Sequence, residues 1–226
     1  MATANRGNSP KLHVNGKVAP EFYSLRDRAL IVLKTEAQTG NAVVVTSCHA
    51  GEGVTTVSVS FAMALAAAGK GRIAVCDANL TTSSLTGLFG LDAGPGFTDL
   101  LAGSCEVAEA AVRADRQSID VIPAGRQEMV LSQAIDSHQF DIVMDQLRTR
   151  YAFVVFDAPP VLDCTATARL AGAADGTILV IEAERERWEV AQKAKDLLEG
   201  AGARILGAVL NKRRFHIPSW LYDRLL

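Results

Sequence analysis

Short apolar runs alternate with longer helical stretches along this chain. The runs are rich in β-branched residues and lie at 42–46, 73–76, 119–122, 153–156, 177–181 and 205–210. Each run is nearly continuous in apolar character, which is typical of strands that helices cover on both faces. The pattern therefore predicts an α/β fold, a doubly wound and mostly parallel sheet with helices on both faces.

The stretches between these runs have helical character. Helices are predicted at 21–38, 54–68, 136–151 and 185–199, each ending near a glycine or at the start of a strand. No repeat, low-complexity tract or internal linker indicates a second domain. We therefore expect one domain over residues 21–211, a flexible N-terminal arm at 1–20 and a C-terminal tail at 212–226.

Composition limits the classes of partner. The 226 residues are 49% hydrophobic and 21% charged, with a net charge of −2, so no overall positive field exists to hold nucleic acid, and we expect no nucleic-acid partner. The first twenty residues lack the features of a secretory signal, and no uncharged apolar run reaches the roughly 18 residues that span a bilayer. The four cysteines are widely spaced, which indicates reduced thiols. We expect a cytoplasmic protein that does not cross a membrane.

A glycine loop joins the first predicted strand to an alanine-rich helix. Gly51 and Gly53 can adopt positive φ, which lets backbone N–H groups converge on phosphate oxygens. The helix that begins near Val54 adds the positive end of its dipole, and Thr55 stands where a hydroxyl would reach Mg²⁺. The segment therefore predicts a phosphate site, although a glycine turn before a helix also occurs as a plain tight connection.

The loop lacks the lysine that a standard phosphate loop carries. That lysine comes directly before the hydroxyl residue and neutralises the β- and γ-phosphates, but here the position is Val54. A charge-assisted hydrogen bond contributes roughly 1.5 to 3 kcal/mol, so nucleotide affinity falls about tenfold to a hundredfold, and the transition state loses more. We expect binding to survive while catalysis is weakened or lost.

Two aspartates follow predicted strands directly. Asp77 ends the run at 73–76, and Asp157 ends the run at 153–156 and begins an Asp-Ala-Pro-Pro segment. Ligands of open α/β sheets bind at the carboxyl ends of the strands, where such carboxylates orient the water shell of Mg²⁺ and align an attacking oxygen. We interpret both residues as metal and catalytic carboxylates, with helix capping as the alternative. His49 and Cys48 are interpreted as a solvent-facing and a small loop residue.

Together these residues resemble the cytoplasmic kinase domain of the bacterial tyrosine kinases that govern capsule and exopolysaccharide assembly, within the Min and Par type ATPase group. The matching segments are 51–53, 77–80, 88–91, 96–101, 122–125, 157–162 and 207–211.

The resemblance implies a P-loop NTPase-like fold with ATP or ADP and Mg²⁺ as ligands. It implies that Asp77 and Asp157 are the metal and catalytic carboxylates, that Thr55 also contacts Mg²⁺, and that Asn211 lies near the adenine. The implied cofactor-binding loop consists of Gly51, Glu52, Gly53, Val54, Thr55 and Thr56. A membrane-embedded polysaccharide chain-length or export protein is the implied partner. It would hold the chain at the inner face of the cell membrane, and a homo-oligomer is also implied.

The chain departs from this family in several places. A basic pair is replaced by Thr81 and Thr82, Thr165 stands where an acidic residue is common, and the oligomer-forming Arg-x-x-Arg pattern survives only partly at 23–26. A tyrosine-rich tail is missing, with Tyr222 the only tyrosine near the end. The departures favour a kinase-like subunit with weakened or lost catalysis.

Two other functions stay open. The first is an active tyrosine kinase whose missing charge comes from a neighbouring subunit, from Arg26 or from the membrane partner. The second is a dinucleotide-binding oxidoreductase, since Asp77 follows Gly53 at an interval that loosely suits a ribose-binding acid. Against the oxidoreductase, Thr56 occupies the place of the third glycine of that fingerprint.

Overall fold

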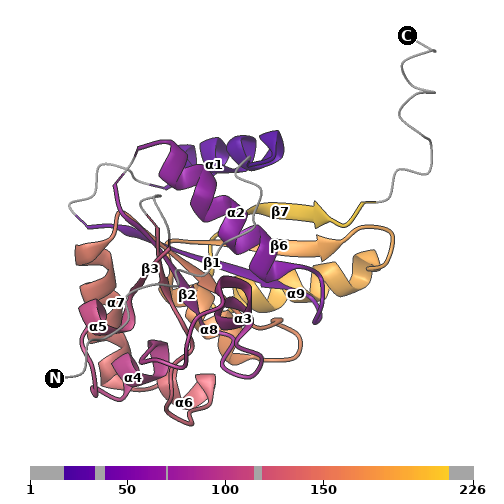
Figure 1. Ribbon diagram of the computed structural model, residues 1–226. Coiled ribbons are helices and arrows are strands. Elements are labelled where there is room, and N and C mark those ends of the chain that lie inside the picture. Colours follow the sequence, from indigo (N-terminus) through magenta and orange to yellow (C-terminus); the bar gives the residue numbers. More distant parts are fainter. Residues whose placement is uncertain (1–17, 34–38, 70, 115–118, 214–226) are drawn as a thin grey trace, which may run out of the picture.

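A seven-stranded sheet runs through the domain in the computed structural model, which describes residues 18–33, 39–69, 71–114 and 119–213 (Figure 1). The strands are β1 Asn41–Ser47, β2 Ile73–Asp77, β3 Val112–Ala114, β4 Ile119–Ile122, β5 Phe153–Asp157, β6 Gly176–Glu182 and β7 Ile205–Asn211. Their order is β3-β4-β2-β5-β1-β6-β7, and every pair is parallel except β3 with β4. The predicted α/β fold class is confirmed.

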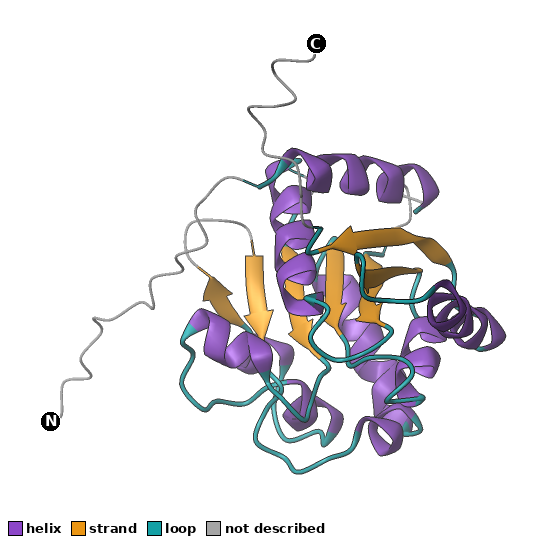
Figure 2. Ribbon diagram, turned by 90° about the vertical axis from the view of Figure 1, so that its right-hand side faces the viewer, coloured by secondary structure: helices purple, strands orange, loops and turns teal. Residues whose placement is uncertain are grey.

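Helices cover both faces of the sheet (Figures 1 and 2). Val43 and Val45 of β1 face α1 Pro20–Val32, α2 Val54–Ala67 and α3 Ser84–Phe89, whereas Ala42 and Val44 face the opposite layer. That layer contains α4 Phe97–Leu101, α5 Val107–Ala110, α6 Leu131–Ile135, α7 His138–Arg150, α8 Ala166–Ala173 and α9 Trp188–Gly200. Because successive strand residues enter opposite cores, the strands need the continuous apolar runs seen in the sequence.

The boundaries differ from the prediction in places. Helix α1 ends at Val32, short of the predicted end at 38, and residues 34–38 lie outside the described residues. The N-terminal arm as far as residue 17 and the tail from residue 214 also lie outside them. None of the described helices combines the length and the apolar character needed to cross a membrane.

The sheet order brings the predicted site elements to one edge. Strands β2, β5 and β1 are neighbours that run in the same direction, so their carboxyl ends lie together. Asp77 and Asp157 are register partners across β2 and β5, and Val45 of β1 is the partner of Asp157 on the other side. The loop that follows β1 therefore emerges beside both aspartates.

Candidate phosphate and metal site

The loop between β1 and α2 presents a run of backbone donors that no described residue accepts. Gly51 and Gly53 turn the chain with φ of +87° and +96°. Among the described residues, no acceptor receives an N–H group of residues 51–56, and the helical bonding begins only where the Val57 N–H donates to the Gly53 carbonyl at 3.1 Å. Six unpaired N–H groups at the start of a helix suit an anion with several oxygens, as a phosphate group has.

Glu52 holds this loop from within. Its carboxylate accepts hydrogen bonds from the backbone N–H groups of Cys48 at 2.8 Å, His49 at 3.2 Å and Glu182 at 3.3 Å, and the residue is 1% exposed. Burial raises the pKa of Glu52, and the three N–H groups oppose that shift to a smaller extent. The carboxylate is thus engaged by the protein, so Glu52 can serve a ligand only through its own backbone N–H.

Asn211 and Lys212, at the end of β7, contact the outer side of the loop. The Asn211 side-chain amide donates to the Glu52 carbonyl at 2.8 Å, and the Lys212 ammonium donates to the Gly51 carbonyl at 2.5 Å. A Cβ atom at Gly53 would lie 2.2 Å from the Asn211 amide nitrogen, so glycine is required there for space as well as for φ. Sequence analysis assigned Lys212 to the tail and missed its contact with the loop.

The two aspartates form a buried carboxylate pair. Asp77 accepts hydrogen bonds from the N–H groups of Asn79 at 3.1 Å and Leu85 at 3.3 Å. Burial, and next the charge of Asp157, raise the pKa of Asp77 to about 7. Burial raises the pKa of Asp157 to about 6, against the smaller lowering by the hydroxyls of Thr55 and Ser58. Both carboxylates therefore exchange protons close to neutral pH, which suits a group that binds a cation or a proton.

The surroundings of Oδ2 of Asp157 show whether Mg²⁺ fits between the loop and the carboxylate pair. Oδ1 of Asp157 accepts a hydrogen bond from the Ser58 hydroxyl at 3.2 Å, but Oδ2 is buried and has no partner among the described residues. A buried unpaired carboxylate oxygen costs free energy unless a cation or donor satisfies it. Carboxylates with the Thr55 hydroxyl form an all-oxygen donor set, and Mg²⁺ uses one or two carboxylates with waters and phosphate oxygens. The residues present fit that ion.

The two threonines at the start of α2 differ in how exposed they are. Thr56 is exposed at the first turn of α2, whereas Thr55 is half-buried and acts on Asp157. Ser58 was missed by sequence analysis, although it lies three residues after Thr55 and so shares its helix face. The spacing from Thr55 is the sequence signal that could have identified Ser58 as a site residue.

His49 and Cys48 lie in different surroundings. Sequence alone places no acid beside His49, but its Nδ1 lies 3.4 Å from Oδ1 of Asp163, which follows β5. Cys48 is buried, and burial together with the charge of Glu52 raises the pKa of its thiol to about 12. Such a thiol is not ionised at neutral pH, which agrees with the interpretation of Cys48 as a small loop residue.

Arg26, on α1, contacts α2 too far from the loop to serve the loop of its own chain. It donates to the Ala64 carbonyl at 3.3 Å and pairs with Asp27. Ala64 comes ten residues after Val54 in the same helix, a separation of about 15 Å along the axis. A contribution of Arg26 to the loop is therefore restricted to a neighbouring subunit.

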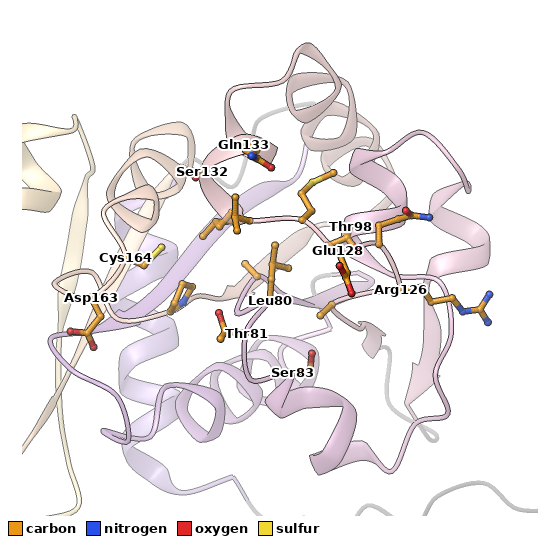
Figure 3. Close-up of a pocket in the computed structure, with 18 residues that line it drawn as sticks. Leu80, Thr81, Ser83, Thr98, Arg126, Glu128, Ser132, Gln133, Asp163 and Cys164 are labelled. Carbon is orange, nitrogen blue, oxygen red and sulfur yellow. The ribbon is translucent and has the colours of Figure 1, made fainter.

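A cavity of about 760 Å³ lies past the carboxyl ends of β2, β4 and β5 (Figure 3). Its walls come from the segments that follow β2, β4 and β5, with Leu80, Arg126 and Asp163 among them. Ala78 and Pro159, which follow the two aspartates closely, also line it. No residue of the loop at 48–56 does, so the cavity offers room for a second molecule next to the loop.

Comparison with known proteins identifies similar chains. A family model described as an AAA domain (AAA_31) matches residues 40–193. The chain is 29% identical to the tyrosine-protein kinase CpsD of Streptococcus agalactiae over 171 residues, which cover 75% of this chain and 73% of the relative. It is 26% identical to the tyrosine-protein kinase YwqD of Bacillus subtilis over 216 residues, which cover 93% and 90%. These matches confirm the resemblance to bacterial tyrosine kinases.

Solved structures agree with this result. The chimerical protein CapA2B2 superposes with a TM-score of 0.80 at 25% identity, covering 92% of this chain and 91% of the other. The septum site-determining protein MinD of Pyrococcus horikoshii, solved in complex with Mg-ADP, gives a TM-score of 0.62 at 23% identity over 83% of this chain and 77% of its own. At that identity the second match shows the fold alone.

Proposed function

Since the chain belongs to the AAA_31 family, we propose that it is a nucleotide-binding, tyrosine-kinase-like subunit of exopolysaccharide or capsule assembly whose catalysis is weakened by Val54. One observation carries the proposal. Within the described part of the chain, the six N–H groups at 51–56 have no acceptor and lie beside a buried carboxylate pair, while an apolar side chain stands where the cation belongs. The loop keeps the neutral donors that hold a phosphate group and lacks the charge that promotes its transfer.

The proposed ligands are ATP or ADP with Mg²⁺. The phosphate oxygens accept hydrogen bonds from the backbone N–H groups of Gly51, Glu52, Gly53, Val54, Thr55 and Thr56. The Thr55 hydroxyl, Asp77 and Asp157 hold Mg²⁺, directly or through its waters, and Asn211 lies near the base. When bound, Mg²⁺ neutralises charge on the phosphate groups. Support comes from the unpaired donors and from the partnerless Oδ2 of Asp157.

The cavity supplies a place for the group that accepts the phosphoryl. Its lining includes Ala78, directly after Asp77, and Pro159, two residues after Asp157, so a tyrosine hydroxyl at this wall of the cavity would lie close to the pair. A carboxylate at this position can accept a hydrogen bond from such a hydroxyl and align its oxygen for attack. We assign this catalytic role to the pair, beside its role in holding Mg²⁺.

A second candidate is an active tyrosine kinase completed in trans. It is favoured by the intact carboxylate pair and by the cavity, which leaves room for an acceptor group that nucleotide binding alone does not need. The missing charge would then come from a neighbouring subunit or from the partner. By contrast, Asp77 is buried and bonded to two backbone N–H groups, so the geometry does not favour the ribose contact of an oxidoreductase.

We also propose the setting of this activity. The chain would work at the cytoplasmic face of the cell membrane with a membrane-embedded polysaccharide chain-length or export protein, and would assemble as a homo-oligomer. The proposed domain covers 21–211, between an arm at 1–20 and a tail at 212–226. Lys212 adds at least one residue of that tail to the domain, because it contacts the loop.

The activity of the purified protein tests the two candidates. We expect hydrolysis of Mg-ATP and autophosphorylation at background level across a wide range of protein concentration, because Val54 leaves the phosphate charge without a partner. An Asp157→Asn variant sets the background. Activity that rises steeply with protein concentration, or on adding the membrane partner, supports completion in trans. Robust turnover by dilute wild-type protein contradicts weakened catalysis.

A further inference from the structure

Lys212 adopts a backbone conformation that is unusual for its residue type. Its φ is +56°, in the left-handed region that favours glycine, directly after the last residue of β7. A lysine there costs free energy that the surrounding contacts must offset. The ammonium lies 2.5 Å from the Gly51 carbonyl oxygen and 3.3 Å from Oε2 of Glu182. These two contacts fix a positive charge on the outer side of the phosphate loop.

The contacts of Asn211 and Lys212 fall on consecutive peptide groups. Lys212 binds the Gly51 carbonyl, which shares a peptide group with the N–H of Glu52. Asn211 binds the Glu52 carbonyl, which shares a peptide group with the N–H of Gly53. Both N–H groups lack an acceptor among the described residues. A donor on a carbonyl polarises its peptide group and strengthens the N–H as a donor, and a charged donor does so most.

We infer that Lys212 supplies, within the same chain and through the Gly51–Glu52 peptide group, part of the positive charge that Val54 does not provide to a bound phosphate. The inference rests on the proposed function of the loop. Lys212 acts as a positioning residue, since its ammonium contacts the carbonyl and not the ligand. The fixed charge of Lys212 strengthens the binding of a phosphate group, but it cannot move with the phosphoryl group as that group is transferred. Lys212 thus offsets part of the loss of binding caused by Val54 and leaves catalysis weak.

Four proteins test this role with inorganic pyrophosphate and adenosine as separate probes. They are the wild type, Lys212→Met, Lys212→Arg and, as the matched control, Arg185→Met. Arg185 also pairs with Glu182, at 3.1 Å, so the control removes a cation from the same carboxylate. We expect Lys212→Met to weaken pyrophosphate binding by about fivefold to twentyfold, at or below the lower end for a lost hydrogen bond to a charged group, because the charge acts through a peptide group.

Adenosine separates this electrostatic role from a structural one. We expect Lys212→Met to leave adenosine affinity within about twofold, Lys212→Arg to recover most of the pyrophosphate affinity, and Arg185→Met to behave as the wild type. Equal losses for adenosine and pyrophosphate, or pyrophosphate binding by Lys212→Met as tight as by the wild type, would overturn the inference.

A measurement without ligand separates the inference from the proposed function. If the wild type binds neither pyrophosphate nor ADP, the proposed function fails. The contact of Lys212 with the Gly51 carbonyl, which we call the tether, can still be tested by hydrogen exchange over the loop at 48–56. The N–H groups of Cys48 and His49 are protected only while the loop keeps Glu52 inside. We expect their exchange to be at least about threefold faster in Lys212→Met than in the wild type and Arg185→Met. Unchanged exchange overturns the tether.

Discussion

Val54→Lys is expected to tighten the binding of Mg-ATP by about tenfold to a hundredfold, because it adds a charge-assisted hydrogen bond at the position that faces the β- and γ-phosphates. Val54 is the first residue of α2, directly after Gly53, and it is half-buried. A lysine there extends from the helix start toward the six unpaired N–H groups. The dissociation constant for Mg-ATP, measured by calorimetry on both proteins, checks this expectation. Turnover should rise by a larger factor, since charge develops in the transition state.

Val54→Met is the matched control. Methionine has a long unbranched side chain like lysine but carries no charge, so it reports what length and helix propensity alone contribute. We expect its affinity for Mg-ATP to stay within about threefold of the wild type, which is below the effect of one charged hydrogen bond. If the lysine and methionine variants bind Mg-ATP equally, the missing charge is not what limits this loop.

Asp157→Asn is expected to stabilise the ligand-free protein at pH 8 by about 2–3 kcal/mol and to leave its stability near pH 4 almost unchanged. The pKa of Asp157 is raised from 3.8 to about 6, mainly by burial. The stability linked to a raised carboxyl pKa is fully present below the unfolded value and is lost as pH rises through the folded value. Ionising Asp157 therefore destabilises the fold between about pH 4 and pH 6, and asparagine removes that cost.

The same substitution acts on its neighbour. Burial is the first cause of the raised pKa of Asp77, and the charge of Asp157 is the second. Without that charge the pKa of Asp77 moves down from about 7, so the loss of stability between pH 4 and pH 8 becomes smaller still. Urea denaturation at several pH values measures the effect, with Asp163→Asn as an exposed control. Parallel stability profiles for wild type and Asp157→Asn would contradict a buried, titrating pair.

The sequence predicted every strand but β3, because each of the others coincides with a nearly continuous apolar run, although β7 at the sheet edge is only partly buried. Strand β3 and helices α3 to α6 span three to six residues each, too few to display a helical or strand period, and were not predicted. The approach of Asp77 to Asp157 could be predicted, since parallel strands place their carboxyl ends at one edge.

The long-range contacts that complete the site could not be predicted by a rule of this kind. Lys212 meets Gly51 across 161 positions of the chain, and Asp163 meets His49 across 114. Neither pair follows from local spacing. The inward turn of Glu52 was also unexpected, because a charged loop residue ordinarily faces solvent. It becomes intelligible only once Cys48, His49 and Glu182 present their N–H groups to one point.

The backbone amide signals of residues 51–56, followed by ¹H–¹⁵N NMR during titration with Mg-ADP, report on the phosphate loop most directly. We predict that these six signals move further than any others near β1 and α2, with downfield proton shifts as each N–H gains a phosphate oxygen as acceptor. Binding of Mg-ADP that leaves them in place, or that shifts signals only around the cavity beside Pro159, would contradict the account.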